Sequence, residues 1–155
     1  MGRYSVTNQL GGTPQAIAAT FKTILSMFAT SGSLRRGRLV EVIVAADGSP
    51  ANNALVVQVA RMTADGTGTT ITPLPLDPAD PAALCTAKAN YTAEPTVTAN
   101  SGVLEFALNQ QATVRWVPDP DTRLMFPATA NNGLVIRVKS ASYTGTVTVT
   151  AIFEE

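Results

Sequence analysis

Two pairs of aspartates come closest, in type and spacing, to the residues of a reactive site. Asp77 and Asp80 lie in the segment LDPADP, and Asp119 and Asp121 lie in VPDPDT. Two carboxylates a few ångströms apart can serve glycoside hydrolysis or bind calcium. Neither pair has the glycine and oxygen-ligand spacing of a calcium loop, and aspartate beside proline is common in turns. We therefore expect turns at both places, with no catalytic and no metal site.

The absence of histidine and the presence of only one cysteine further limit the reactions and metal sites that the chain can support. The chain has no histidine, which is the commonest general base and a common metal ligand. Cys85 is the single cysteine, so the chain has no internal disulfide and no CxxC motif. A cysteine nucleophile needs a neighbouring base, normally histidine. We interpret Cys85 as a small, semi-buried thiol, and we predict that the protein is not an enzyme and uses no cofactor.

The densest run of charge is RRGR at residues 35–38. Three arginines are too few to hold duplex DNA through counterion release alone. Two interpretations stay open: a solvated turn that leads into a strand, or guanidinium forks that bind the carboxylates of a partner subunit. The candidate partner-contact residues are Arg35, Arg36 and Arg38, together with Asp77 and Asp80 of the proline-rich segment.

Aromatic residues and glycines offer two further kinds of site. Trp116 and Phe126 could line a sugar-binding platform, but most aromatic residues here alternate along predicted strands, which favours burial. The glycines at 11–12 and 66–68 match neither of the common phosphate-binding loop patterns. We expect no nucleotide site, and we keep carbohydrate binding as an alternative.

Composition favours a structural or binding protein. The chain has 155 residues, about the length of one domain, and 45% of them are hydrophobic. Only 14% are charged, against about 25% in ordinary soluble domains. A surface so poor in charge is suited to being covered by a partner. The formal net charge of zero argues against a nucleic-acid partner, and no apolar run approaches the ~20 residues of a membrane span.

Residues 1–37 form an N-terminal section in which we predict a helix over residues 14–29. Thr13 and Pro14 suit the cap and first position of a helix. Apolar side chains follow at helical spacing: Ile17, Phe21, Ile24, Leu25 and Phe28. Threonines and bulky apolar residues in the same stretch also suit a strand. Whether this helix packs into the core or reaches out as an interaction arm stays open.

The sequence of residues 38–155 predicts a series of β-strands. Segments 38–46 and 54–62 are apolar on both faces, as strands buried inside a sandwich should be. Apolar and polar residues alternate in four later segments: 103–108, 113–117, 134–139 and 146–153. Short strands at near-regular spacing, separated by turn residues, predict an all-β, jelly-roll-like antiparallel β-sandwich.

A proline-rich segment interrupts this pattern at residues 72–95. It contains five prolines: Pro73, Pro75, Pro78, Pro81 and Pro95. Because proline cannot donate to a central ladder, we predict a long crossover, with one helical turn around residues 82–88. The crossover packs over an edge of the sandwich, touches a neighbouring molecule, or does both.

Several stretches together resemble the jelly-roll cement (decoration) proteins of tailed bacteriophages. They are LRRGRLVEVIVAADGSPANNAL (34–55), LDPADPAA (76–83), YTAEPTVTAN (91–100), NQQATVRWVPDP (109–120) and FPATANNGLVIRVKSASYTGTVTVTAIF (126–153). The resemblance covers about residues 34–155. It rests on stretches of sequence that are structural and not catalytic, and it includes no residue motif for capsid contact. It implies a β-jelly roll that trimerises and clamps major capsid protein subunits.

The resemblance and the composition together give one expectation. We expect a non-enzymatic virion protein, made in the host cytoplasm, which binds the outside of the capsid lattice and stabilises it. Its partners would be the major capsid protein and two further copies of itself in a homotrimer. The alternatives are another head or tail structural protein, and a carbohydrate-binding jelly-roll module of a phage receptor-binding structure. A polysaccharide hydrolase ranks last.

Overall fold

The computed structural model describes residues 1–155 as two antiparallel six-stranded sheets packed face to face, with no α-helix. Sheet 1 contains β1 (Arg3–Thr7), β3 (Gly37–Ala46), β6 (Leu74–Pro75), β9 (Thr113–Trp116), β10 (Leu124–Phe126) and β12 (Val147–Glu154). Sheet 2 contains β2 (Lys22–Phe28), β4 (Ala54–Ala64), β5 (Thr67–Ile71), β7 (Thr86–Ala93), β8 (Thr96–Asn109) and β11 (Gly133–Lys139). The two short 3-10 helices are η1 (Asn8–Gly11) and η2 (Pro120–Thr122). The prediction of an antiparallel β-sandwich is confirmed.

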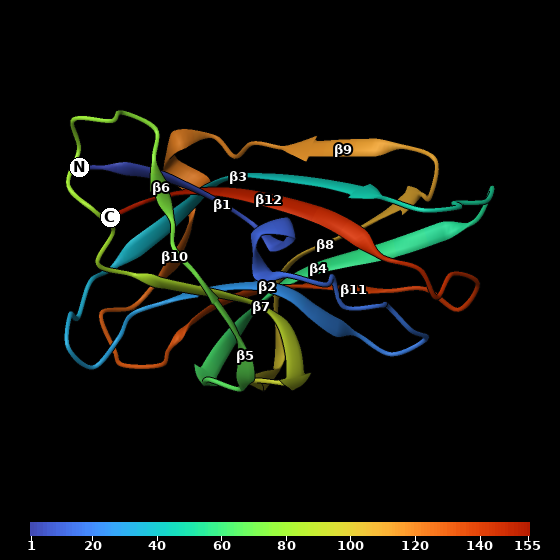
Figure 1. Cartoon of the computed structure of the whole chain (residues 1–155), viewed down its shortest axis with the longest axis horizontal. Coiled ribbons are helices and arrows are strands. Elements are labelled where there is room, and N and C mark those ends of the chain that lie inside the picture. The colour runs from blue at the N-terminus through green and yellow to red at the C-terminus, as the bar shows by residue number, and fades with distance from the viewer.

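The strands pair in a nested order. β1 pairs with β12, β2 with β11, and β4 with β8, while β3 pairs with β9 and β10; β12 and β11 lie next to β3 and β4 on their other sides. Strands from the beginning of the chain therefore pair with strands from its end, and middle strands pair with each other. In Figure 1 the two sheets lie one above the other, and both termini lie at the left-hand end.

The N-terminal section corrects the predicted helix over residues 14–29. Lys22–Phe28 is the strand β2, which lies between β7 and β11 in sheet 2. All residues from Thr23 to Phe28 are buried, so the strand is covered on both faces. A run buried on both faces has no alternation, and its apolar residues fit helical spacing equally well. Because β1 and β2 belong to different sheets, residues 1–37 are part of the sandwich and do not form a separate arm.

The core lies between the sheets as a cluster of 26 buried residues. The prediction that one face of residues 146–153 points inward is confirmed, since four side chains there are fully buried: Val147, Val149, Ala151 and Phe153. Leu134, Ile136 and Val138 of β11 close the core from the opposite sheet. Burying each large apolar side chain contributes about 1.5–3 kcal/mol.

The proline-rich segment crosses from one sheet to the other. Its first part, β6, pairs with β1 at the edge of sheet 1, where a proline is tolerated because no central ladder is interrupted. Residues 76–85 follow without helix or strand, and β7 then enters sheet 2. The helical turn predicted around residues 82–88 is wrong, because the strand begins at Thr86 and buries Ala87 and Ala89 in the core.

Candidate functional site

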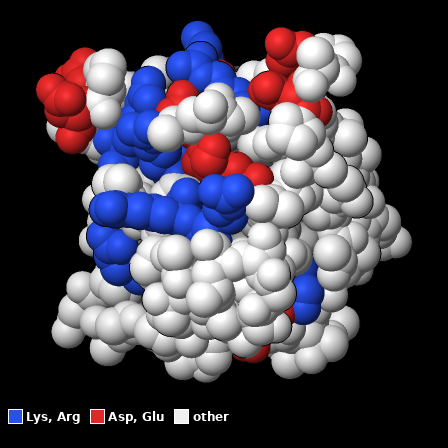
Figure 2. Space-filling view, turned by 90° about the vertical axis from the view of Figure 1, so that its left-hand side faces the viewer, with Lys and Arg blue, Asp and Glu red and all other residues white.

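Arginines gather at the end of the sandwich where both termini lie. We call this surface the arginine end; its six arginines are Arg3, Arg35, Arg36, Arg38, Arg61 and Arg123. Figure 2 faces this end and shows the basic side chains grouped over its upper half, with acidic side chains among and beside them. Most of the remaining surface in this view is uncharged.

Strand pairing brings these residues together from distant parts of the sequence. β12 lies between β1 and β3, and its register sets Glu154 opposite Arg3 on one side and Arg38 on the other. Arg123 directly precedes β10, which pairs with the start of β3. The sequence identified Arg38 as a candidate but missed Arg3, Arg123 and Glu154, since only the register shows that they meet.

Glu154 is the centre of an ion-pair network at the arginine end. Its side chain is only 5% exposed, and Arg3 Nε donates to its Oε1 at 2.8 Å. Arg38 Nε and Arg123 Nη1 lie 3.0 Å and 2.8 Å from Oε2. One carboxylate thus holds three guanidinium groups, which leaves local positive charge and fixes the positions of these arginines.

A close approach of two strands positions the arginines around Gly37. Phe126 of β10 lies opposite Gly37 of β3, and a Cβ added at this glycine would collide with the Phe126 ring. The ring also makes an edge contact with Phe153, with centroids 6.3 Å apart. The buried ring therefore fixes the start of β3, which carries Arg38 and directly follows Arg36.

One hollow of the arginine end contains two of the predicted contact residues. Arg35 and Asp80 both line a cavity of about 670 Å³, together with Tyr4, Leu84 and Glu155. Tyr4 donates from its hydroxyl to the carbonyl of Pro81 at 3.1 Å. Burial raises the pKa of Tyr4, and nearby Glu155 and Asp80 raise it further, so the hydroxyl keeps its proton.

Asp77 has a different place from Asp80. Its carboxylate accepts a hydrogen bond from the Ala79 amide at 2.9 Å, and its carbonyl accepts one from the Asp80 amide at 3.0 Å. These bonds close a turn in the connection between β6 and β7. The structure therefore gives Asp77 a local structural role and places only Asp80 in the hollow.

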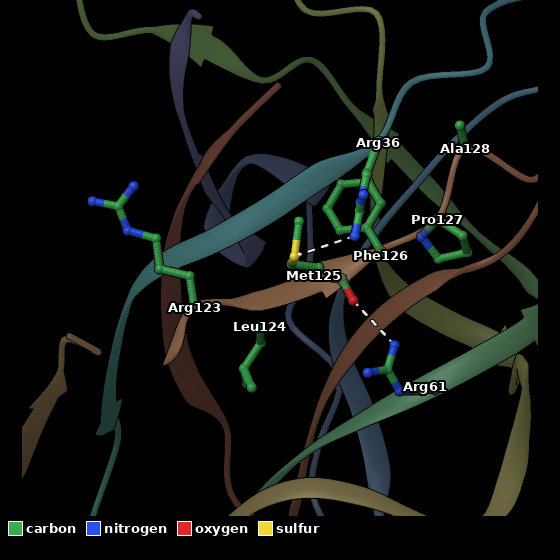
Figure 3. Close-up of a pocket in the computed structure, with 8 residues that line it drawn as sticks. All are labelled: Arg36, Arg61, Arg123, Leu124, Met125, Phe126, Pro127 and Ala128. Carbon is green, nitrogen blue, oxygen red and sulfur yellow. Dashed lines mark hydrogen bonds between the residues drawn. The ribbon is translucent and has the colours of Figure 1, made fainter. Parts of the chain in front are cut away.

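A second hollow lies against β10 and has a volume of about 590 Å³. Arg36, Arg61 and Arg123 line it, together with the segment Leu124–Ala128 (Figure 3). Arg61 comes from β4 of sheet 2 and was not a candidate in the sequence, where it is an isolated basic residue. Arg36 also lines a smaller hollow beside Arg38 and Glu154, so the two cavities share a wall.

Exposed apolar side chains lie beside the charged ones. Leu34 is 55% exposed and directly precedes Arg35, while Leu76 is 51% exposed. The amide of Leu76 donates to the carbonyl of Arg3 at 2.8 Å, which places it at the same end. Met1 and Leu84 are also exposed and line the hollow of Arg35. Exposed apolar groups mixed with arginine are typical of surfaces that bind other proteins.

Two further residues considered for catalysis or metal binding, Asp119 and Cys85, lie in structural positions. Asp119 accepts through its carbonyl from the Thr122 amide at 2.9 Å, in the turn of η2. Cys85 is buried, and this burial raises its pKa well above the ordinary value, with Glu155 adding to the shift. No group of three or more potential metal-ligating side chains is present.

The two aromatic residues considered for sugar binding do not form an exposed platform. Phe126 is 1% exposed and belongs to the core. Trp116 is half-buried and packs against the same core from β9. The Phe126 ring therefore has no exposed face for a sugar, and the Trp116 ring is partly covered by the core.

Comparison of the chain with family models, curated proteins and solved structures found no match. The structure has no helix that combines the length and hydropathy needed to cross a bilayer.

Proposed function

We propose that this chain is a structural protein of a tailed-bacteriophage particle, a cement protein that binds the outside of the capsid lattice and stabilises it. The single observation that carries the proposal is the arginine end, where guanidinium forks and exposed leucines share one surface. Such a surface suits docking on a protein that presents carboxylates and apolar side chains.

The strand order supports the jelly-roll part of this proposal. A jelly roll is two sheets formed by rolling up a long hairpin, so that early strands pair with late ones. The pairs β1–β12, β2–β11 and β4–β8, with β3 beside β9 and β10, follow that nested order. Strands β5, β6 and β7 are then an insertion between β4 and β8. Jelly rolls of this kind build many viral capsid domains.

We propose that the protein stabilises the capsid by mass action, through its binding equilibrium with the lattice. A protein that binds only the assembled and expanded lattice lowers the free energy of that state by its binding free energy. This stabilisation requires no catalysed reaction, only a rigid docking surface and many bound copies of the protein. The ion pairs of Glu154 and the packing of Phe126 supply this rigidity at the arginine end.

Self-association into a trimer is the second part of the proposal. Strand β8 is 14 residues long and forms one edge of sheet 2, so its outer backbone groups are free to pair or to be covered. Val103 on this strand is 37% exposed. Long edges of this kind are usually protected in natural proteins. Light scattering should give three times the 16.2 kDa chain mass, and a monomer at micromolar concentration contradicts the trimer.

Co-sedimentation with undecorated capsid shells tests the function directly. The protein is mixed with compact and with expanded shells, and the bound fraction is measured across a salt series. We expect binding to expanded shells only. The double variant Arg35→Ala, Arg36→Ala should bind more weakly than the wild type, with the greatest difference at low salt, because exposed charge pairs are screened.

A matched control removes two basic charges elsewhere. Arg115 lies on β9 with its side chain 65% exposed, and Lys22 begins β2. The double variant Arg115→Ala, Lys22→Ala should bind shells like the wild type. Absence of wild-type binding to either shell form contradicts the proposed function. Binding instead to host surface polysaccharide would favour the carbohydrate-binding alternative.

A further inference from the structure

Arg36 and Arg61 are two arginines of the arginine end that form no ion pair within the chain. Both contact the same residue of β10. Arg36 Nη2 lies 3.4 Å from the Met125 sulfur, and Arg61 Nη1 donates to the Met125 carbonyl at 3.1 Å. Each guanidinium uses a single hydrogen bond of modest strength, so most of its donors stay available.

The hollow that these two arginines line is open to a ligand. Figure 3 shows Arg36 and Arg61 on two sides of the Met125–Phe126 backbone, with Pro127 and Ala128 continuing the wall beyond them. The Arg123 guanidinium points away from this pair, toward its partner Glu154. The available positive charge in the hollow is therefore that of Arg36 and Arg61.

The neighbouring network shows what these guanidinium groups can bind. Glu154 accepts from three arginines at 2.8–3.0 Å within the same end of the sandwich. An arginine fork matches a carboxylate in geometry and charge, so the free guanidinium groups of Arg36 and Arg61 both suit a second carboxylate in this hollow. The wall beside them is apolar, from Leu124 to Ala128, which favours a protein ligand over a free polyanion.

We propose that the pocket of Arg36 and Arg61 binds the carboxylate of an aspartate or glutamate side chain from an acidic segment of a partner protein. An apolar side chain next to that carboxylate would pack on Met125 and Pro127. The inference rests on the proposed function, which supplies the partner as a capsid subunit. It adds Arg61 as a binding residue and names the chemistry that is recognised.

The first experiment uses short probes and the whole isolated protein. N-acetyl-Asp-Leu-amide, N-acetyl-Asn-Leu-amide and inorganic phosphate are titrated separately, and the backbone amides of residues 124–128 and the arginine Nε–H groups are followed by NMR. The Asp probe should shift the signals of Met125, Phe126, Arg36 and Arg61. The Asn probe, which lacks the charge, should bind at least about tenfold more weakly.

Variants decide whether the pocket itself binds the probe. Arg36→Gln and Arg61→Gln should each weaken binding of the Asp probe by about tenfold or more. Both side chains are exposed, so folding is checked by an unchanged amide spectrum away from the pocket. The control is Arg115→Gln, which removes one exposed arginine on β9; this arginine is paired with Glu41 and lies outside the hollow, so the substitution should leave the probe titration unchanged.

The outcomes separate this inference from the proposed function. Tighter binding of phosphate than of the Asp probe, or equal binding by Arg61→Gln and wild type, overturns the carboxylate pocket. Co-sedimentation of Arg61→Gln with expanded shells is then compared with the wild type. Undiminished sedimentation of the variant overturns the pocket while the cement function stands. Probe binding without any wild-type sedimentation overturns the function while the pocket stands.

Discussion

Arg3 and Glu154 are joined by a hydrogen-bonded ion pair of 2.8 Å, so the third residue of the chain is tied to its penultimate one. The pair lies at the end of the β1–β12 ladder, where the two residues are opposite each other in register. The first strand of the chain is therefore held by the last, and the N-terminal section is a structural part of the sandwich.

The first prediction concerns burial in that section. Leu25→Ala removes a fully buried side chain from the inner strand β2, which should lower the free energy of unfolding by about 2–5 kcal/mol. Leu10→Ala, at a side chain that is 57% exposed, should change it by no more than about 0.5 kcal/mol. Urea denaturation measures both. Equal effects of the two substitutions would mean that residues 1–37 are not packed as described.

The second prediction concerns the charge at the centre of the arginine network. Glu154→Gln keeps the size of the side chain but leaves three arginines without their carboxylate, and should destabilise the fold by about 1–3 kcal/mol. The loss stays below the 3–5 kcal/mol typical of breaking fully buried pairs, because the arginine side chains are 21–56% exposed.

A matched glutamate provides the control for this substitution. Glu105 is exposed and accepts only from Gln58 Nε2, at 2.7 Å. Glu105→Gln should change the unfolding free energy by less than about 0.5 kcal/mol. A Glu154→Gln protein as stable as Glu105→Gln would show that the network is not structurally important.

The third prediction concerns pH. A hydrogen bond from Arg115 lowers the pKa of Glu41, and this exceeds the opposing effect of burial. Since the folded pKa lies below the unfolded one, the pair stabilises the fold above the unfolded pKa of about 4.3. This stabilisation is lost as the pH falls through the folded pKa. The stability difference between wild type and Arg115→Gln, measured by urea denaturation from pH 7 to 2.5, should shrink on acidification. A difference independent of pH contradicts this assignment.

The fourth prediction concerns the single thiol. Cys85 is 3% exposed, and burial raises its pKa, so the native protein at pH 8 should contain almost no reactive thiolate. Labelling with a thiol reagent should be slow in the native state and complete after unfolding in urea. Rapid labelling of the native protein would show that the loop around Cys85 opens readily.

Alternation of apolar and polar residues made much of the fold predictable from the sequence. The absence of this alternation in β2 explains why a helix was predicted there. Residues 146–153 alternate because one face of β12 meets the core, so their inward side chains could be read directly. β2 is buried on both faces and shows no such period, which allowed a helix to be predicted. The residue propensities of this segment could not decide between helix and strand, because packing against neighbouring strands on both sides determines which of the two forms.

The candidate site was predictable mainly where its residues form a run in the sequence, with Asp80 of the proline-rich segment as the exception. Arg35, Arg36 and Arg38 form a visible run and do lie at the arginine end. Arg61 and Arg123 are isolated in the sequence and reach the same hollow only through the arrangement of β4 and β10. Their grouping follows from the fold, which sequence spacing does not encode.

We propose above that the chain binds capsids as a structural component. The most direct measurement is the copy number of this protein in purified phage particles, determined by quantitative mass spectrometry against the major capsid protein. We expect a number comparable to that of the capsid protein, and loss of this protein from particles when Arg35 and Arg36 are both replaced by alanine. Its absence from particles, or a presence of only a few copies, would contradict the proposed function.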